Sequence, residues 1–121
     1  MKYLGPKTDG DDLATQSDVF AKAQTVETKT AAYTLATGDA GKLIAVNSAS
    51  GVSVTVDGSL DLAAGQRIDL VQLGAGQVTI AESGATVDAT PTLKLRAQYS
   101  AATLIGLGSD TYLLIGDLAA S

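Results

Sequence analysis

The 121-residue chain contains neither cysteine nor histidine. These absences exclude disulfides, thiolate metal sites, thiol nucleophiles and imidazole general bases. A serine or threonine nucleophile would need a lysine as its base, and no lysine of the chain lies in an apolar run that would lower its pKa. We therefore expect a protein that is not an enzyme and that uses no metal and no cofactor.

Aromatic residues are also scarce, with no tryptophan, one phenylalanine and four tyrosines. The core of a chain of this length must then consist of leucine, isoleucine, valine and alanine. Such a core favours thin, closely packed β layers over a deep ligand cavity. The length corresponds to a single domain.

Basic residues are few and scattered, with eight Lys and Arg against thirteen Asp and Glu, for a net charge of −5. Binding to a nucleic-acid backbone depends on clustered cations, so nucleic acid is not an expected partner. No apolar run approaches the length of about 20 residues that crosses a bilayer, and the first residues lack the apolar middle of a secretory signal. We expect no membrane partner.

Short apolar runs separated by turn residues make up the rest of the chain. Val52 to Val56 alternates strictly between apolar and polar residues, which is typical of a half-buried strand. Loops 74–76 and 108–110 have the composition of hairpin turns, so the runs on either side of each are expected to pair. The pattern predicts an all-β fold, a compact antiparallel sandwich or barrel of about nine short strands.

The first 24 residues differ from this pattern. Residues 1–12 indicate an extended arm, and Thr15 and Asp18 have the spacing of a helix N-cap with an acidic residue in the first turn. We therefore divide the chain into a docking arm with a short helix, residues 1–24, and a β-sandwich or barrel domain, residues 25–121. The arm packs either on its own β domain or on a partner, and the candidate partner-binding side chains are Tyr3, Leu4, Leu13, Val19 and Phe20.

Other candidate sites have a simpler structural interpretation. The Gly74-x-Gly76 and Gly106-x-Gly108 pairs lie between strands and open no helix, which argues against phosphate binding. Asp57, Asp61 and Asp69 are interpreted as solvated turn and surface acids rather than as a calcium or glycosidase site. Tyr99 is predicted to contact either the core or a neighbouring subunit, and it is the candidate subunit-interface residue.

Residues 31–118 resemble a β domain of tailed-bacteriophage virion proteins. The residues that carry the resemblance are Tyr33–Leu35, Asp39-Ala-Gly-Lys42-Leu, Asn47–Ser50, Val52-x-Val-Thr-Val56, Gly65-Gln-x-Ile68-Asp, Gln72-x-Gly-Ala-Gly76-Gln-x-Thr-Ile80, Leu93-Lys-Leu-x-x-Gln98-Tyr-Ser-Ala-Ala-Thr-Leu104 and Gly116-Asp-Leu118. Related domains occur in head-fibre and capsid decoration proteins and in tail-fibre and minor tail proteins. The resemblance carries over no catalytic residues.

The resemblance implies a role in virion assembly or display. A short chain with an arm fits a capsid decoration protein, located on the outer capsid surface of the virion, that binds the major capsid protein through its N-terminal arm and stabilises or decorates the shell. Symmetric assembly is expected, with a homotrimer favoured. The alternative is a tail-fibre or minor tail module that binds a host receptor or glycan.

Overall fold

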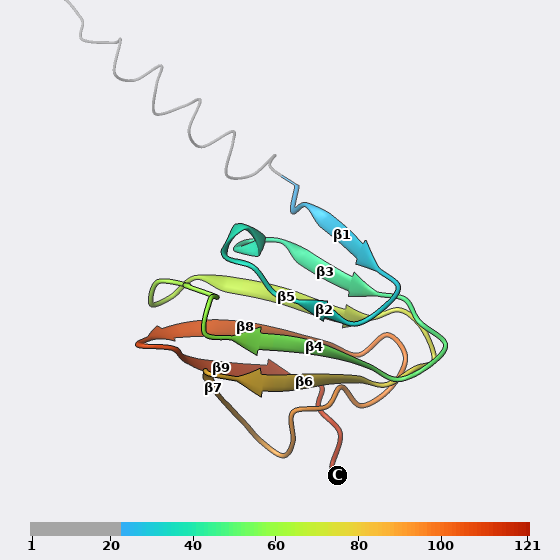
Figure 1. Cartoon of the computed structure of the whole chain (residues 1–121). Coiled ribbons are helices and arrows are strands. Elements are labelled where there is room, and N and C mark those ends of the chain that lie inside the picture. Colours follow the sequence, from blue (N-terminus) through green and yellow to red (C-terminus); the bar gives the residue numbers. More distant parts are fainter. Residues whose placement is uncertain (1–22) are drawn as a thin grey trace, which may run out of the picture.

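The computed structural model describes residues 23–121, which form two β-sheets packed face to face (Figure 1). The elements are β1 (Val26–Lys29), β2 (Tyr33–Thr34), the 3-10 turn η1 (Thr37–Asp39), β3 (Leu43–Val46), β4 (Val52–Asp57), β5 (Arg67–Gln72), β6 (Val78–Ser83), β7 (Thr86–Ala89), β8 (Ala101–Gly108) and β9 (Thr111–Gly116). The predicted all-β class is confirmed, and the described residues contain the expected nine strands.

The strand order differs from the predicted antiparallel arrangement. One sheet has six strands in the order β1-β3-β5-β8-β9-β7, and the other has three in the order β2-β4-β6. β1, β3 and β5 are parallel, as are β2, β4 and β6, whereas β8 is antiparallel to both β5 and β9. The antiparallel prediction is therefore wrong for the first half of the chain and for β7, which is parallel to β9, and it is correct for β8 with its neighbours β5 and β9.

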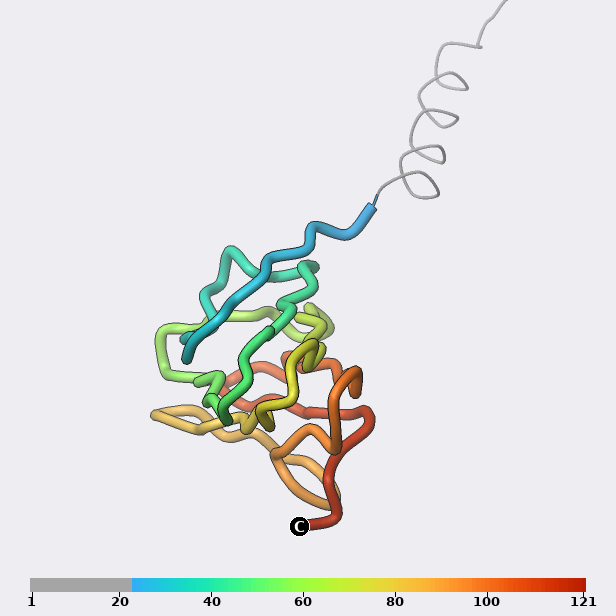
Figure 2. The backbone as a smooth tube through the Cα atoms, turned by 90° about the vertical axis from the view of Figure 1, so that its right-hand side faces the viewer, coloured from blue at the N-terminus to red at the C-terminus, as the bar shows by residue number. Residues whose placement is uncertain are grey.

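The parallel strands arise because the chain winds in coils. β3 and β4 form one coil and β5 and β6 the next, and the chain can be followed around these coils in Figure 2. Between these two coils the strand partners are 26 residues apart in both sheets, Leu43 with Asp69 and Val52 with Val78. The two sheets therefore advance together from coil to coil, and loop 73–77 lies directly on loop 47–51.

Loop 74–76 shows how closely the coils stack. The Gly76 N–H donates a hydrogen bond of 2.8 Å to the Ser48 carbonyl. A Cβ on Gly76 would lie 2.0 Å from the Ser50 carbonyl oxygen, so this position requires glycine. The predicted hairpin at this loop is wrong, because the loop joins β5 in one sheet to β6 in the other instead of folding them together.

The second predicted hairpin, β8 and β9, is confirmed. Ser109 and Asp110 have φ angles of 55° and 56°, the left-handed conformation that tight turns between antiparallel strands require. The hairpin fills the space between β5 and β7, and β7 lies at the far edge parallel to β9. The last part of the chain thereby extends the six-stranded sheet beyond the coils.

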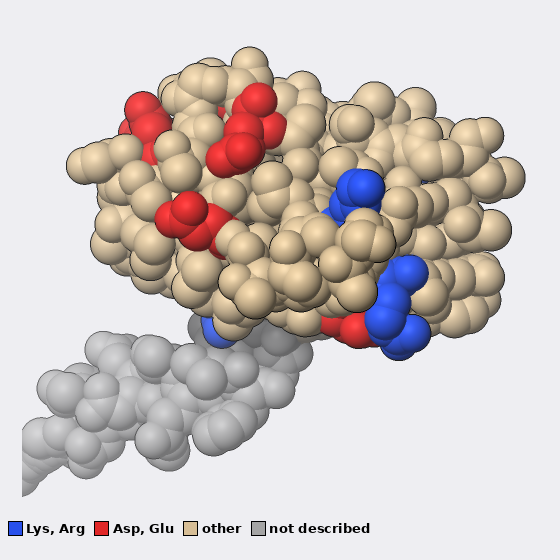
Figure 3. Space-filling model, turned by 90° about the horizontal axis from the view of Figure 1, so that it is seen from below, with Lys and Arg blue, Asp and Glu red and all other residues tan. Residues whose placement is uncertain are grey.

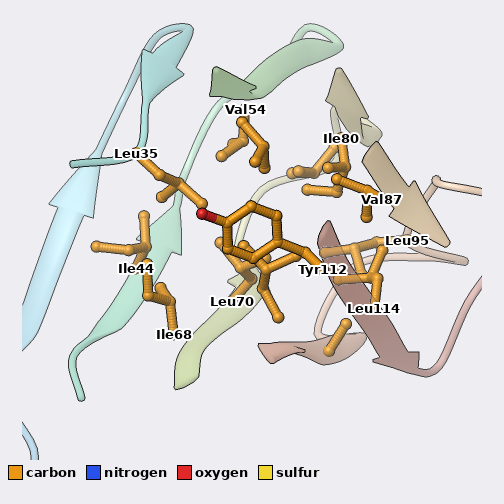
Figure 4. Packing of buried hydrophobic residues seen from close by; sticks show 14 of the residues in the cluster. Leu35, Ile44, Val54, Ile68, Leu70, Ile80, Val87, Leu95, Tyr112 and Leu114 are labelled. Atoms are coloured by element: carbon orange, nitrogen blue, oxygen red, sulfur yellow. The ribbon is translucent and has the colours of Figure 1, made fainter. Parts of the chain in front are cut away.

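Leucine, isoleucine and valine fill the space between the sheets, as predicted, with Tyr112 in the middle (Figure 4). Val54 and Ile80 come from the three-stranded sheet, and Ile68 and Leu70 from the six-stranded sheet. The Tyr112 hydroxyl donates a hydrogen bond of 2.7 Å to the Leu60 carbonyl. This hydrogen bond connects residues 58–66 to the core. Each fully buried aliphatic side chain of the core contributes about 1.5–3 kcal/mol to the stability of the fold.

Leu60 and Leu62 are both buried, which confirms that they close the end of the core.

β1 is an edge strand, as predicted from its charges. The Lys29 ammonium lies 3.7 Å from the Glu27 carboxylate and 4.2 Å from the centre of the Tyr33 ring. The helix predicted after Thr15 lies outside the described residues. Within residues 23–121, no helix has the length and apolar character needed to span a membrane.

Candidate interaction surfaces

Two of the three acids considered as a catalytic or calcium site, Asp57 and Asp69, use their carboxylates in separate local hydrogen bonds, and the backbone N–H of Asp61 donates a bond of 2.8 Å to the Thr37 hydroxyl. Asp57 accepts hydrogen bonds from the Ser59 N–H at 3.0 Å and from the Ser59 hydroxyl at 2.6 Å, and these bonds lower the pKa of Asp57. Asp69 accepts bonds from the Gln24 side-chain amide at 2.6 Å and from the Thr103 hydroxyl at 2.7 Å. Across residues 23–121, no three acidic, histidine or cysteine side chains are grouped so that they could hold a metal ion.

A buried polar cluster supports the turn between β2 and β3. The Asp39 carboxylate is 3% exposed and accepts hydrogen bonds from the Tyr33 hydroxyl at 2.7 Å and the Ala36 N–H at 2.9 Å. The Lys42 ammonium lies 3.7 Å from the same carboxylate. Because each polar group has a local partner, the cluster stabilises the turn.

The pH dependence of stability tests this cluster. The hydrogen bond to Asp39, with burial, raises the pKa of Tyr33 to about 12 from 10.0. A raised tyrosine pKa means that the bond stabilises the fold fully below pH 10 and is lost as the pH rises through about 12. Denaturant unfolding at a series of alkaline pH values should show a loss on the order of 1 kcal/mol after solvent screening. In Tyr33→Phe that loss should be smaller, and an identical pH profile in the two proteins would contradict it.

Tyr99 lies at the surface, where it is 71% exposed, and it has a left-handed φ of 71°. Its N–H donates a hydrogen bond of 2.6 Å to the Gln72 carbonyl, so the backbone is fixed while the ring faces solvent. The structure excludes the core position that was one expectation for Tyr99. The ring is available for a contact with another molecule, which leaves its role at a subunit interface as a prediction.

An ion pair holds the Tyr99 loop in place. The Arg96 guanidinium donates two hydrogen bonds of 2.8 Å to the Asp117 carboxylate, which also accepts one of 2.6 Å from the Ser100 hydroxyl. These bonds, with that of Arg96 first, lower the pKa of Asp117 to about 2. Sequence reasoning missed this pair because its members are far apart along the chain and no local pattern connects them.

The N-terminal segment joins the β domain at the edge of the six-stranded sheet. Gln24 fixes this junction, since its side-chain amide donates a bond of 2.6 Å to Asp69 and one of 3.2 Å to the Gly41 carbonyl. Val26, the first residue of the edge strand, is 57% exposed. The predicted partner-binding residues precede this junction, and all of them, Tyr3, Leu4, Leu13, Val19 and Phe20, lie outside the described residues.

The junction and the last residues of the chain lie at opposite ends of the β domain (Figures 1 and 2). The face at the end away from β1 is largely uncharged, with acidic side chains toward one side and Lys and Arg toward the other (Figure 3). The surface seen in that view therefore lacks the cationic stripe of a nucleic-acid binding site.

The described part of the chain thus has a fixed attachment point for the N-terminal segment, an exposed tyrosine on a rigid loop, and acids that are engaged in local structure. No protein-family model, curated protein or solved structure matches the chain.

Proposed function

We propose that this chain is a non-enzymatic structural protein of a tailed-phage virion, a capsid decoration protein on the outer surface of the shell. Residues 1–24 bind the major capsid protein, and the β domain projects outward and reinforces or decorates the shell. The protein acts as a homo-oligomer, with a trimer favoured by the resemblance of residues 31–118 to virion β domains. It requires no cofactor, nucleic acid or membrane for this role.

The observation that carries the proposal is that the N-terminal junction and the final residues lie at opposite ends of the β domain. The N-terminal segment joins at the β1 edge, where Gln24 fixes the backbone, and the β8–β9 hairpin and the final residues lie away from this edge. A partner bound by the segment before Ala23 therefore leaves most of the domain surface uncovered. This separation of an attachment point from a rigid body suits a protein that is displayed on a larger assembly.

Binding to capsids tests the role of the arm. We expect the full chain to cosediment with shells assembled from the major capsid protein, and the variant Leu13→Ala/Val19→Ala/Phe20→Ala to bind about a hundredfold more weakly or worse, because three apolar contacts are lost. The matched control, Gln16→Ala/Lys22→Ala, changes polar positions of the same segment and should bind normally. Circular dichroism establishes that each variant retains its β structure.

Equal binding by the triple variant and the unmodified chain would refute the arm as the docking element. Failure of the unmodified chain to bind shells, together with binding to host cells or their surface polysaccharide, would instead favour the tail-fibre or minor tail role. A truncated chain made for the same purpose should lack residues 1–22 only, because the side chain of Gln24 is bonded to the β domain.

A further inference from the structure

The outer face of the six-stranded sheet points away from β2, β4 and β6 (Figure 1), and it carries several partly exposed apolar side chains. Its side chains alternate along the strands with the core residues, and the partly exposed apolar members are Leu43, Val71, Ile105, Leu113 and Ile115. In residues 23–121, none of these five belongs to the buried core cluster or packs against it. An apolar face of this kind on a small protein indicates a contact surface.

One row of residues across this outer face has a distinctive order. Strand register places Arg67 beside Ile105, Ile105 beside Leu113, and Leu113 beside Asp88. The row thus begins with a cation on β5 and ends with an acid on β7, with two apolar side chains between them. Arg67 and Asp88 are both exposed, and neither is in an ion pair within residues 23–121.

The shape of the outer face is a second feature that suits a contact between copies. Ile115, which is 49% exposed, borders two surface hollows of about 480 Å³ and 470 Å³. One hollow is lined by Leu43 and Ala101, and the other by Ala89 and Leu113. A projecting side chain between two hollows allows an opposing surface of the same shape to interdigitate with it.

We propose that copies of this chain pack against one another through this outer face. When a second copy is turned over onto the face with its strands aligned, the row runs in the reverse order. Arg67 then lies opposite Asp88 of the other copy, and Ile105 opposite Leu113, in both directions. This reciprocity is the property of an isologous interface, in which one patch is complementary to itself. This contact joins two copies related by a two-fold axis parallel to the strands, so in a trimeric protein it would join one trimer to another and not the subunits within a trimer.

Self-association is favoured over other occupants because the charges of the row are complementary to the row itself. A partner of different sequence would need a matching cation and acid at the same spacing, about 14 Å for three strand separations. The contact does not depend on where the protein is located in a virion. Its test uses purified protein, so its failure is distinguishable from a failure of capsid binding.

Light scattering coupled to size-exclusion chromatography gives the mass of the full chain and of each variant. The unmodified chain should have the mass of a dimer or of a larger even-numbered assembly, and Ile115→Asp should lower the apparent association constant at least tenfold. Ser53→Asp is the matched control, because it adds the same charge at an exposed position on the outer face of the other sheet and should leave the mass unchanged. Circular dichroism and thermal melting check that each variant is folded.

Charge reversal gives a second test, which does not require a charge to be placed at an apolar position. Arg67→Asp and Asp88→Arg should each weaken association, and the double variant should restore it, because the swapped charges again face each other. A monomeric unmodified chain overturns the proposal, as does an oligomer that tolerates Ile115→Asp. Failure of the double variant to restore association overturns the proposal too. If residues 1–22 covered the outer face instead of a second copy, the unmodified chain would be a monomer, which is one of the overturning results.

Discussion

Replacement of Gly76 by alanine should destabilise the protein by about 3 kcal/mol or more, a large part of the 5–15 kcal/mol by which domains are commonly stable. The added Cβ would lie 2.0 Å from the carbonyl oxygen and 2.2 Å from the carbonyl carbon of Ser50. Both atoms belong to the backbone of the neighbouring coil, so a side-chain rotation cannot relieve the clash. Loops 47–51 and 73–77 would have to separate, which also breaks the Gly76 N–H bond to Ser48.

Gly38→Ala is the control for this prediction. A Cβ on Gly38 meets nothing within 4 Å in the described structure, and Gly38 does not have a positive φ. Its replacement should therefore change the free energy of unfolding by only a few tenths of a kcal/mol. Urea unfolding of the two variants measures the difference, and similar midpoints for both would show that the coils are not stacked as described.

Replacement of Tyr112 by alanine should cost about 3–5 kcal/mol, the range for removing a large aromatic side chain from a core. Tyr112 is 2% exposed and lies between the two sheets, near Val54 and Ile80 on one side and Leu70 on the other (Figure 4). The cavity would border residues of both sheets, so neither sheet could close it by moving alone. Thermal unfolding followed by circular dichroism measures the loss.

Tyr112→Phe separates the ring from the hydroxyl. It keeps the packing but removes the donor to the Leu60 carbonyl, and a buried hydrogen bond of this kind contributes about 1 kcal/mol. The phenylalanine variant should therefore be only slightly less stable than the unmodified protein. If the two variants were equally unstable, the hydrogen bond and not the packing would dominate, contrary to the expectation.

Local sequence patterns predicted the strands well because each strand depends on its own residues. The alternation of Val52 to Val56 and the turn chemistry of Ser109 and Asp110 act over a few residues, and both predictions agree with the structure. Loop 74–76 was misjudged because glycine suits both a hairpin and a close approach of two backbones. The choice between them depends on residues 26 positions earlier, which turn propensities do not consider.

One signal in the sequence could have indicated the coils. Residues 46–58, VNSASGVSVTVDG, and 72–84, QLGAGQVTIAESG, share alanine, valine and glycine at equivalent positions when offset by 26. The offset equals the register between β3 and β5 in one sheet and between β4 and β6 in the other. The match is weak because the stacked loops interact mainly through backbone atoms, which constrain the size of a side chain more than its identity.

The candidate surfaces were harder to predict than the strands. The loop that carries Tyr99 is bonded through an ion pair between Arg96 and Asp117, which are 21 residues apart, and the apolar outer face depends on the order of strands in the six-stranded sheet. Neither follows from a short pattern. The sequence did indicate the local roles of the acids, because Asp57 and Ser59 have the spacing of a side-chain-capped turn.

The shared offset of the two sheets has a consequence for how such a domain can change in length. A segment of 26 residues is one full coil, so an internal duplication of this size adds one strand to each sheet without altering the register of the others. Each duplication would lengthen the body by one strand spacing, about 4.8 Å. Proteins of this architecture can therefore evolve, or be engineered, as rods of graded height with unchanged ends.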